Sequence, residues 1–215
     1  MPDPISWEFS WPYLTAALLG GYLLGSIPFG VVLTRIAGMG DIRKIGSGNI
    51  GATNVLRTGN KGLALATLLL DGGKGAAAVL IGWTWGPDTA VVAGTGALIG
   101  HMAPVWLMFR GGKGVATALG ILLAIAWPVG LAACGTWLAT AAIFRYSSLA
   151  ALVALAAAPA YAVWLADPQI MELAGFTAVL VWLRHWQNIV RLLRGREPKI
   201  GRKEKPVTDG NKTVS

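Results

Sequence analysis

The sequence is short of charged residues. Asp, Glu, Lys and Arg make up 13% of its 215 residues, whereas soluble proteins average about 25%. Apolar residues reach 54%, above the soluble norm of roughly 45–50%. These residues are grouped in runs close to the length that crosses a bilayer. The composition therefore excludes an ordinary water-soluble domain and indicates a polytopic membrane protein.

Cysteine is nearly absent as well. The one cysteine, Cys134, lies inside an apolar run, which excludes a disulfide framework, a CxxC metal site and any cysteine cluster. We expect Cys134 to serve in packing.

The first residues lack positive charge. Residues 1–11 contain Asp3 and Glu8 but no Lys or Arg, so the cationic region that begins a signal peptide is missing. We therefore expect the first apolar run to remain in the mature protein as a membrane span.

The apolar runs predict an all-α bundle of seven transmembrane helices. The spans cover residues 12–34, 63–85, 89–109, 114–127, 128–144, 147–166 and 173–192. The fourth and fifth are shorter than the ~20 residues that a bilayer requires, and Pro128 can instead mark a kink in one long, bent element. Five or six spans is therefore the alternative count.

Seven spans place the charges on two sides. Seventeen of the eighteen Lys and Arg residues fall on one side, and only Lys74 lies inside a span. Nine of the seventeen lie in the region 184–212, and the others are Arg35, Arg43, Lys44, Arg57, Lys61, Arg110, Lys113 and Arg145. The other side has no cation and carries Asp3, Glu8, Asp88, Asp167 and Glu172. Positive loops stay in the cytoplasm, so we expect the N-terminus outside and the C-terminus inside.

Residues 203–215 are polar and have no apolar periodicity. They predict a disordered tail that follows a single membrane domain over residues 1–202.

The net charge of +8 alone would suit nucleic acid, anionic lipid or a phosphorylated substrate. Its placement on one side of a membrane domain decides between them, and we expect membrane lipid and phosphorylated substrates as partners and no nucleic acid. A basic tail would also suit a non-catalytic scaffold that binds lipid.

The first of three polar segments on the cationic side is KIGSGNIGATNVLR, residues 44–57. Its three glycines let backbone N–H groups turn toward a common point. Neutral side chains around that point come from Ser47, Asn49, Thr53 and Asn54. If residues 52–57 form a helix, Arg57 lies one turn from Thr53 and adds a bidentate contact to an anion. The alternative is a polar loop that needs glycines only to turn.

The second segment is RGGKGVAT, residues 110–117, directly before an apolar run. Flexible glycines that lead into a helix N-terminus form a phosphate cradle, and Lys113 would add a point charge. Val115 follows Gly114 and no strand precedes the loop, so the pattern is not a Walker loop and an ATPase is rejected.

The third segment is RHWQNIVRLLR, residues 184–194, at the inner end of the last span. His185 and Asn188 share a helical face, and Arg184 and Arg191 lie one turn from Asn188. A histidine there can shuttle a proton or donate to an oxyanion. An ordinary positive flank explains the arginines but not His185 and Asn188.

Four other polar residues are less specific. Asp71 and Lys74 lie three residues apart inside the second span, where mutual pairing is the default and substrate contact the alternative. Ser148 either reaches the pocket or caps a helix. His101 has apolar neighbours, so we expect a buried, hydrogen-bonded histidine rather than a catalyst.

Together these segments resemble the acyl-phosphate-dependent glycerol-3-phosphate acyltransferase family of bacterial membranes. The resemblance covers nearly the whole chain and rests on GSIPFG (25–30), GSGNIGATN (46–54) with Arg57, LDGGKG (70–75), GHMAP (100–104), RGGKGVAT (110–117), YSSL (146–149), and RHWQN (184–188) with GRE (195–197).

The resemblance implies a seven-helix enzyme of the bacterial inner membrane, with its active site facing the cytoplasm and with no metal or cofactor. Acyl phosphate would donate its acyl group to the 1-hydroxyl of glycerol 3-phosphate, giving lysophosphatidic acid and phosphate. The family's functional positions would fall on Ser47, Asn49, Asn54, Arg57, Lys113, Ser148, His185 and Asn188.

From the residues and the resemblance together we expect Ser47, His185 and Asn188 to be catalytic. Substrate binding is expected of Asn49, Thr53, Asn54, Arg57, Lys113 and Ser148. Arg57, Lys113 and Ser47 would hold phosphate, while His185 and Asn188 orient the hydroxyl. Either His185 or a substrate phosphate would accept the proton.

The rival hypothesis is a transporter of phosphate or another small anion, which would also use helix N-termini and cations. A transporter should carry polar residues through the depth of the bilayer, whereas here polarity is concentrated at one face. A serine hydrolase, an HxxxxD acyltransferase and an HExxH zinc enzyme are disfavoured because their motifs are missing.

Overall fold

The computed structural model describes residues 7–201, and every regular element within them is a helix. The expected all-α class is therefore confirmed. The predicted tail, residues 203–215, lies outside the described residues. The helices are α1 Trp7–Gly25, α2 Phe29–Ile36, η1 Ile42–Lys44, α3 Ala52–Arg57, α4 Lys61–Trp83, α5 Pro87–Met102, η2 Val105–Leu107, α6 Val115–Ile125, α7 Trp127–Phe144, α8 Ser147–Leu165, α9 Pro168–Arg184 and α10 Trp186–Leu193.

Each of the seven expected spans overlaps one main helix, namely α1, α4, α5, α6, α7, α8 and α9. Five segments of the described chain are long and apolar enough to cross a membrane: Phe9–Ile36, Lys61–Trp83, Pro87–Leu107, Trp127–Phe144 and Ser147–Leu165. The remaining two helices are shorter, with 11 residues in α6 and 17 in α9.

Two spans that the sequence predicted as continuous are broken, so that part of the prediction is wrong. The first is interrupted at residues 26–28, between α1 and α2. Pro28 explains this break because proline disfavours helical geometry in the residue before it. The last span is interrupted at His185, which ends α9 and precedes α10.

The alternative of one bent element at Pro128 is also wrong. Helix α6 ends at Ile125, and Ala126 leaves helical geometry with φ −149° and ψ 84°. Gly130 of α7 then lies so close to Leu123 of α6 that a Cβ on Gly130 would overlap its backbone. Residues seven apart touch in this way only if the chain turns back on itself, so α6 and α7 are two packed helices.

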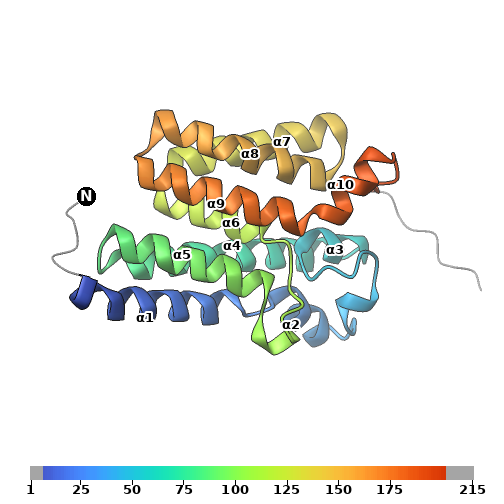
Figure 1. Ribbon diagram of the computed structural model, residues 1–215. Coiled ribbons are helices and arrows are strands. Elements are labelled where there is room, and N and C mark those ends of the chain that lie inside the picture. Colours follow the sequence, from blue (N-terminus) through green and yellow to red (C-terminus); the bar gives the residue numbers. More distant parts are fainter. Residues whose placement is uncertain (1–6, 202–215) are drawn as a thin grey trace, which may run out of the picture.

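The long helices lie side by side along one axis, with α2, α3 and α10 gathered at one end (Figure 1). Helix α1 packs on α5, and α4 packs on both α5 and α6. The chain then continues through α7, α8 and α9, each packed on the one before. The polar segments expected to form the site therefore meet at the end that carries the short helices.

Small residues allow the close contact between α1 and α5. Gly25 lies against the backbone of Ala97, and Gly100 lies against the backbone of Tyr22. Without hydrophobic attraction between helices in lipid, such close approach supplies much of the packing energy.

Lys74 and Asp71 form the expected buried ion pair inside α4. Lys74 Nζ lies 2.8 Å from Asp71 Oδ1, and each side chain is 1% exposed. The same ammonium donates to the carbonyl of Ile27 at 2.7 Å and lies 5.6 Å from the centre of the Phe29 ring. Lys74 therefore also ties the break between α1 and α2 to α4.

Gly25→Ala should destabilise the bundle. Its Cβ would overlap the carbonyl oxygen of Ala97, and such overpacking typically costs about 1–3 kcal/mol, so the thermal unfolding midpoint in detergent should fall. Gly20→Ala on the same helix is the control, because no atom beyond the adjacent backbone of α1 lies within 4 Å of its Cβ position and alanine favours a helix. Equal midpoints for the two variants would contradict this account of the α1–α5 contact.

Candidate active site

A large cavity of about 1840 Å³ opens among α3, α4, α6, α7, α8 and α10. All nine residues that the sequence singled out for catalysis or substrate binding line it: Ser47, Asn49, Thr53, Asn54, Arg57, Lys113, Ser148, His185 and Asn188. Segments more than 130 residues apart in the chain thus contribute to one space.

Asn54 organises the first polar loop. The side chain is 1% exposed, and its Nδ2 donates to the carbonyls of Ile42, Ile45 and Asn49 at 3.1, 2.9 and 2.9 Å. Its Oδ1 accepts from the backbone N–H of Ser47 at 3.0 Å and from the Ser47 hydroxyl at 3.2 Å. Because the loop occupies both ends of this amide, we infer that Asn54 holds Ser47 in place.

Gly46 lets this loop close around Asn54. Its φ is +56°, which favours glycine, and a Cβ there would lie 2.6 Å from Asn54 Oδ1 and 3.1 Å from Cδ of Arg57. Arg57 therefore lies beside the loop. It is the last residue of α3, and this helix confirms the one expected over residues 52–57. Thr53 Oγ1 lies 3.1 Å from the hydroxyl of Ser147, so α3 also contacts the start of α8.

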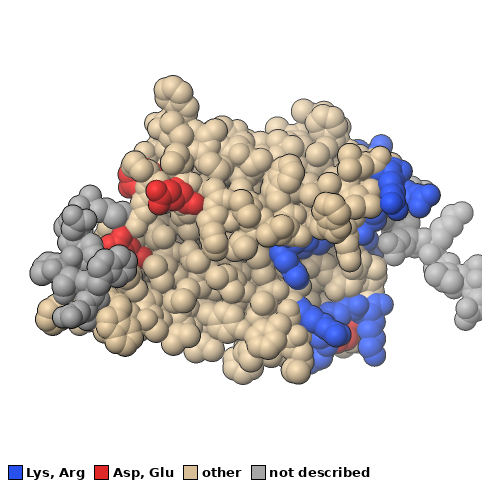
Figure 2. Space-filling model, viewed as in Figure 1, with Lys and Arg blue, Asp and Glu red and all other residues tan. Residues whose placement is uncertain are grey.

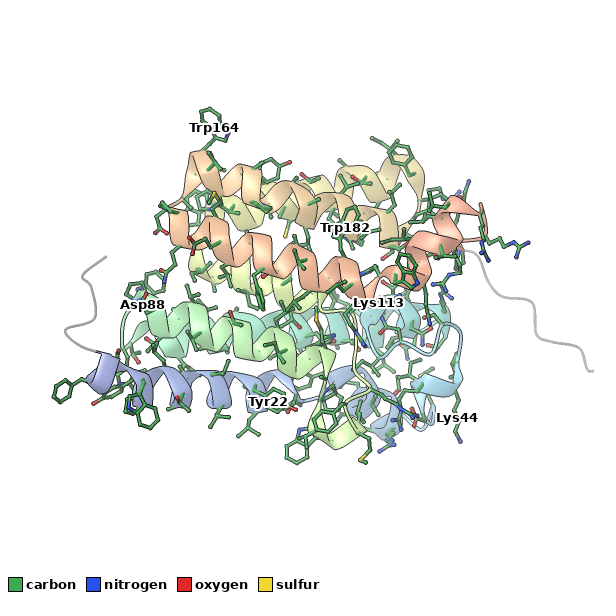
Figure 3. All side chains as sticks on the ribbon, viewed as in Figure 1. Tyr22, Lys44, Asp88, Lys113, Trp164 and Trp182 are labelled. Carbon is green, nitrogen blue, oxygen red and sulfur yellow. The ribbon has the colours of Figure 1, made fainter. Side chains whose placement is uncertain are left out.

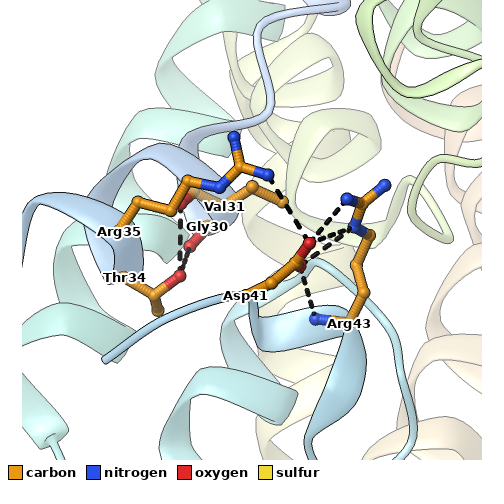
Figure 4. Close-up of polar contacts among 6 residues, drawn as sticks. All are labelled: Gly30, Val31, Thr34, Arg35, Asp41 and Arg43. Carbon is orange, nitrogen blue, oxygen red and sulfur yellow. Dashed lines mark hydrogen bonds and ion pairs between the residues drawn. The ribbon is translucent and has the colours of Figure 1, made fainter. Parts of the chain in front are cut away.

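The outer edge of this loop is held by Asp41 (Figure 4). Arg43 donates to it through Nη2 at 2.6 Å, and Arg35 lies 3.5 Å from the same oxygen. Hydrogen bonding to Arg43 holds the pKa of Asp41 far below its usual value. Thr34 secures α2 nearby by donating to the carbonyl of Gly30 at 2.8 Å.

The second loop leads into α6, as the sequence predicted. Gly114 caps the helix with φ 82°, and Val115 and Ala116 of the first turn line the cavity. The free N–H groups of a first turn favour an anion. Lys113 Nζ donates to Asn188 Oδ1 at 2.5 Å, so the second and third polar segments meet directly.

The pKa of Lys113 is lowered toward neutral pH. Burial lowers the pKa of Lys113 to about 8, and the positive charges of Arg191, Arg57 and Arg184 oppose its protonation further, against the favourable charge of Glu197. An anion bound among these cations would restore the ordinary preference of Lys113 for the charged form.

His185 is a neutral imidazole, and one of its nitrogens is hydrogen-bonded to the backbone. It is 2% exposed, and Nδ1 lies 2.8 Å from the carbonyl of Val181. Burial lowers the pKa of His185 to about 4, and the nearby charges of Lys113 and Arg184 act in the same direction. With Nδ1–H donating to Val181, Nε2 is the acceptor nitrogen.

Glu197 is the site residue that sequence reasoning missed. Its Oε1 accepts from Ser148 at 2.6 Å and from Asn188 Nδ2 at 2.5 Å, while Oε2 accepts from Arg191 at 2.7 Å. Burial alone would raise the pKa of Glu197, but these three donors hold it below its ordinary value. The available signal was a lone acidic residue in a strongly basic stretch, within the GRE motif.

Ser148 does not cap α8, so that alternative is wrong. The capping residue is Tyr146, and Ser148 is the second residue of the helix, with its hydroxyl directed to Glu197.

The segment 195–201 forms one wall of the cavity. The backbone N–H of Ile200 donates to the carbonyl of Arg145 at 2.7 Å, and the ammonium of Lys199 lies 5.7 Å from the centre of the Tyr146 ring. Together with the contacts of Glu197, these interactions hold the segment against the turn between α7 and α8.

Apolar side chains from three helices also line the cavity. They are Leu68 and Leu69 of α4, Leu119 and Leu123 of α6, and Cys134, Trp137 and Leu138 of α7. A lipid chain can lie between such walls, while the polar part of the cavity holds charged groups. Within residues 7–201 there is no group of three or more His, Cys, Asp or Glu residues that could hold a metal ion.

The protein-family model described as "Glycerol-3-phosphate acyltransferase" matches residues 15–195. The chain belongs to this family. Among curated relatives, the glycerol-3-phosphate acyltransferase of Paramagnetospirillum magneticum is 65% identical over 198 residues, covering 92% of this chain and 98% of that protein. The glycerol-3-phosphate acyltransferase of Rhodospirillum rubrum is 60% identical over 201 residues, covering 89% and 93%.

Two solved structures share the fold. Both are crystal structures of PlsY (YgiH), an integral membrane glycerol 3-phosphate acyltransferase. The glycerol 3-phosphate form has a TM-score of 0.82 at 38% identity and covers 87% of this chain and 96% of that one. The lysophosphatidic acid form has a TM-score of 0.80 at 37% identity and covers 87% and 95%. The family predicted from the motifs is confirmed, and the comparisons support this acyltransferase family rather than the anion transporter.

Anion binding should weaken as pH rises through about 8, the pKa of Lys113, because Lys113 is charged below that value and neutral above it. Sulfate is a suitable probe, since its charge does not change in this range. From about pH 7 to about 9.5 its affinity, measured by calorimetry, should approach a loss of about tenfold per pH unit. Lys113→Arg stays charged and should largely abolish the dependence; an identical pH profile in that variant would assign the titration to another group.

Proposed function

We propose that the protein transfers an acyl group from an acyl phosphate to the 1-hydroxyl of glycerol 3-phosphate, releasing lysophosphatidic acid and phosphate. The observation that supports this most directly is the lining of the cavity. Its cationic residues suit phosphate groups, and its apolar residues suit an acyl chain. Its family supports glycerol 3-phosphate as acceptor and lysophosphatidic acid as product.

We assign the phosphate groups of the two substrates to Arg57, Lys113 and Ser47. Two of these residues are cationic, and the hydroxyl of Ser47 is fixed by Asn54. Asn49, Thr53 and Ser148 line the same space and add polar contacts. Asn54 contributes by holding the loop, because its own amide is engaged there.

In the proposed reaction, the hydroxyl oxygen of glycerol 3-phosphate attacks the carbonyl carbon, and the bond from that carbon to the phosphate oxygen breaks. Acyl phosphate brings an activated carbonyl and a good leaving group, so no covalent enzyme intermediate is needed. The protein aligns the two substrates and stabilises the oxyanion and the departing phosphate.

The proton of the hydroxyl goes to a phosphate oxygen of a substrate rather than to His185. With a pKa of about 4, the imidazole is a weaker base than a phosphate ester, whose second pKa is about 6. We assign to His185 the task of orienting the acceptor, with Nε2 accepting a hydrogen bond from the hydroxyl of glycerol 3-phosphate that does not react. Asn188, which is held by Lys113 and Glu197, fixes the neighbouring part of the acceptor.

We also propose seven spans with the N-terminus outside and the C-terminus in the cytoplasm, within one domain over residues 1–202. Lys and Arg gather at one end of the visible face, and most of the visible Asp and Glu lie at the other (Figure 2). Asp88 and Lys44 mark these opposite ends (Figure 3). Positive loops stay in the cytoplasm, so the cavity would face the cytoplasmic side of the inner membrane.

Purified protein should release lysophosphatidic acid from glycerol 3-phosphate and an acyl phosphate. Lys113→Ala and Arg57→Ala each remove a charge-assisted contact to phosphate, which is worth about 1.5–3 kcal/mol, so the KM for a phosphate substrate should rise roughly 10- to 100-fold. His185→Ala should mainly lower kcat, by about 100-fold if it misaligns the hydroxyl. Wild-type kinetics in any of the three variants would refute the role proposed for that residue.

The orientation can be tested with single cysteines placed in a Cys134→Ser background. Thr84→Cys lies at the end marked by Asp88, and Arg194→Cys lies just after α10; both positions are exposed. A membrane-impermeant maleimide should label Thr84→Cys in intact spheroplasts, and Arg194→Cys only after the membrane is opened. The reverse pattern would invert the proposed topology.

A further inference from the structure

The imidazole of His101 lies directly beneath the glycine loop that carries Lys113. His101 is in the last turn of α5, is 4% exposed and lines the cavity. A Cβ on Gly112 would overlap Nε2 of this ring and would lie in tight contact, at 3.0 Å, with its Cδ2 and Cε1. The ring therefore sets how closely Gly112 can approach α5.

The two peptides before Lys113 are held from both sides. On one side, the N–H of Gly112 donates to the carbonyl of His101 at 3.0 Å, and the N–H of Gly111 donates to the carbonyl of Met102 at 3.2 Å. On the other side, Arg184 donates through Nε to the carbonyl of Gly112 at 3.2 Å and through Nη2 to the carbonyl of Gly111 at 3.1 Å. Every backbone polar group of the two glycines is therefore engaged.

The buried ion pair of α4 faces the same ring. Asp71 Oδ1 lies 3.6 Å from His101 Nδ1, and Asp71 is itself neutralised by Lys74. A carboxylate on the Nδ1 side leaves the opposite edge of the ring for Gly112. Thr117 donates to the backbone carbonyl of Asp71 at 2.9 Å, so the first turn of α6 is tied to the same point of α4.

Pairing alone does not account for these charges. A buried ion pair can often be replaced by apolar residues without loss of stability, and charges inside a membrane segment are costly and mark functional regions. Here the pair lies against a histidine that supports the loop of the proposed phosphate site.

We propose that His101, oriented by Asp71 and Lys74, is a positioning residue for Lys113. The ring fixes Gly112 from the membrane side while Arg184 fixes it from the cytoplasmic side. Together they place the ammonium of Lys113 and the first N–H groups of α6 for a substrate phosphate. The inference rests on the proposed function only in assigning that phosphate to Lys113. His101 does not itself touch substrate.

A rescue experiment tests this arrangement. Gly112→Ala should raise the KM and the Kd for glycerol 3-phosphate about tenfold or more, because its methyl group overlaps the ring and shifts the loop. His101→Ala should raise them as well, because the loop loses its support. In the double variant the overlap is gone, so the KM and Kd should be several-fold lower than in Gly112→Ala alone.

Gly111→Ala is the matched control. Its Cβ would overlap the carbonyl oxygens of His101 and Met102, which are backbone atoms that His101→Ala leaves in place. The pair Gly111→Ala with His101→Ala should therefore show no rescue. Rescue at both glycines, or at neither, overturns the proposal, as does an unchanged KM and Kd in His101→Ala.

Binding and turnover separate this proposal from the proposed function. Glycerol 3-phosphate affinity is measured by calorimetry on the intact protein in detergent, and the unfolding midpoint of each variant is recorded alongside. Absence of acyl transfer by the wild type would reject the proposed reaction, while the binding series would still decide the role of His101. If His101→Ala does not fold, His101→Asn, which also shortens the side chain, takes its place in the same pairs.

Discussion

Repulsion between gathered cations is the constraint on which the site depends. Lys113 lies within the field of Arg57, Arg184 and Arg191, which together disfavour its charge. Glu197 is the counter-charge that the same cavity provides, and it also bonds Asn188 and Ser148. The lining of the cavity therefore carries excess positive charge, which a dianionic phosphate would offset. Because an anion lowers the repulsion between these cations, the cavity favours anions over neutral molecules.

Much of this arrangement was predictable from the sequence, for a physical reason. Bilayer thickness sets the length of an apolar run, so each predicted apolar run overlaps one main helix of the bundle, although several ends differ by more than five residues. Polar side chains avoid lipid, so those at one end of the spans had to share a small area. Their convergence followed from sidedness, even though Ser47 and His185 are far apart in the chain.

What the sequence could not supply were features decided by tertiary contacts. The breaks at residues 26–28 and at His185 are stabilised by partners from elsewhere, such as Lys74 bonding to Ile27. Hydropathy averages over such breaks. Glu197 was missed because its importance lies in the donors that surround it, from α8 and α10. The His101 ring was seen as merely buried because nothing in the local pattern indicates that Gly112 rests on it.

The segment 195–201, the last part of the chain that the structure describes, lies beside the cavity. Its backbone bonds to Arg145, its carboxylate bonds to Ser148, and its residues line the cavity. The last described residues of the chain therefore line the same cavity as the proposed site residues. A protein fused after residue 201 would be tethered beside this cavity. Its bulk and charge would then affect which molecules reach the cavity.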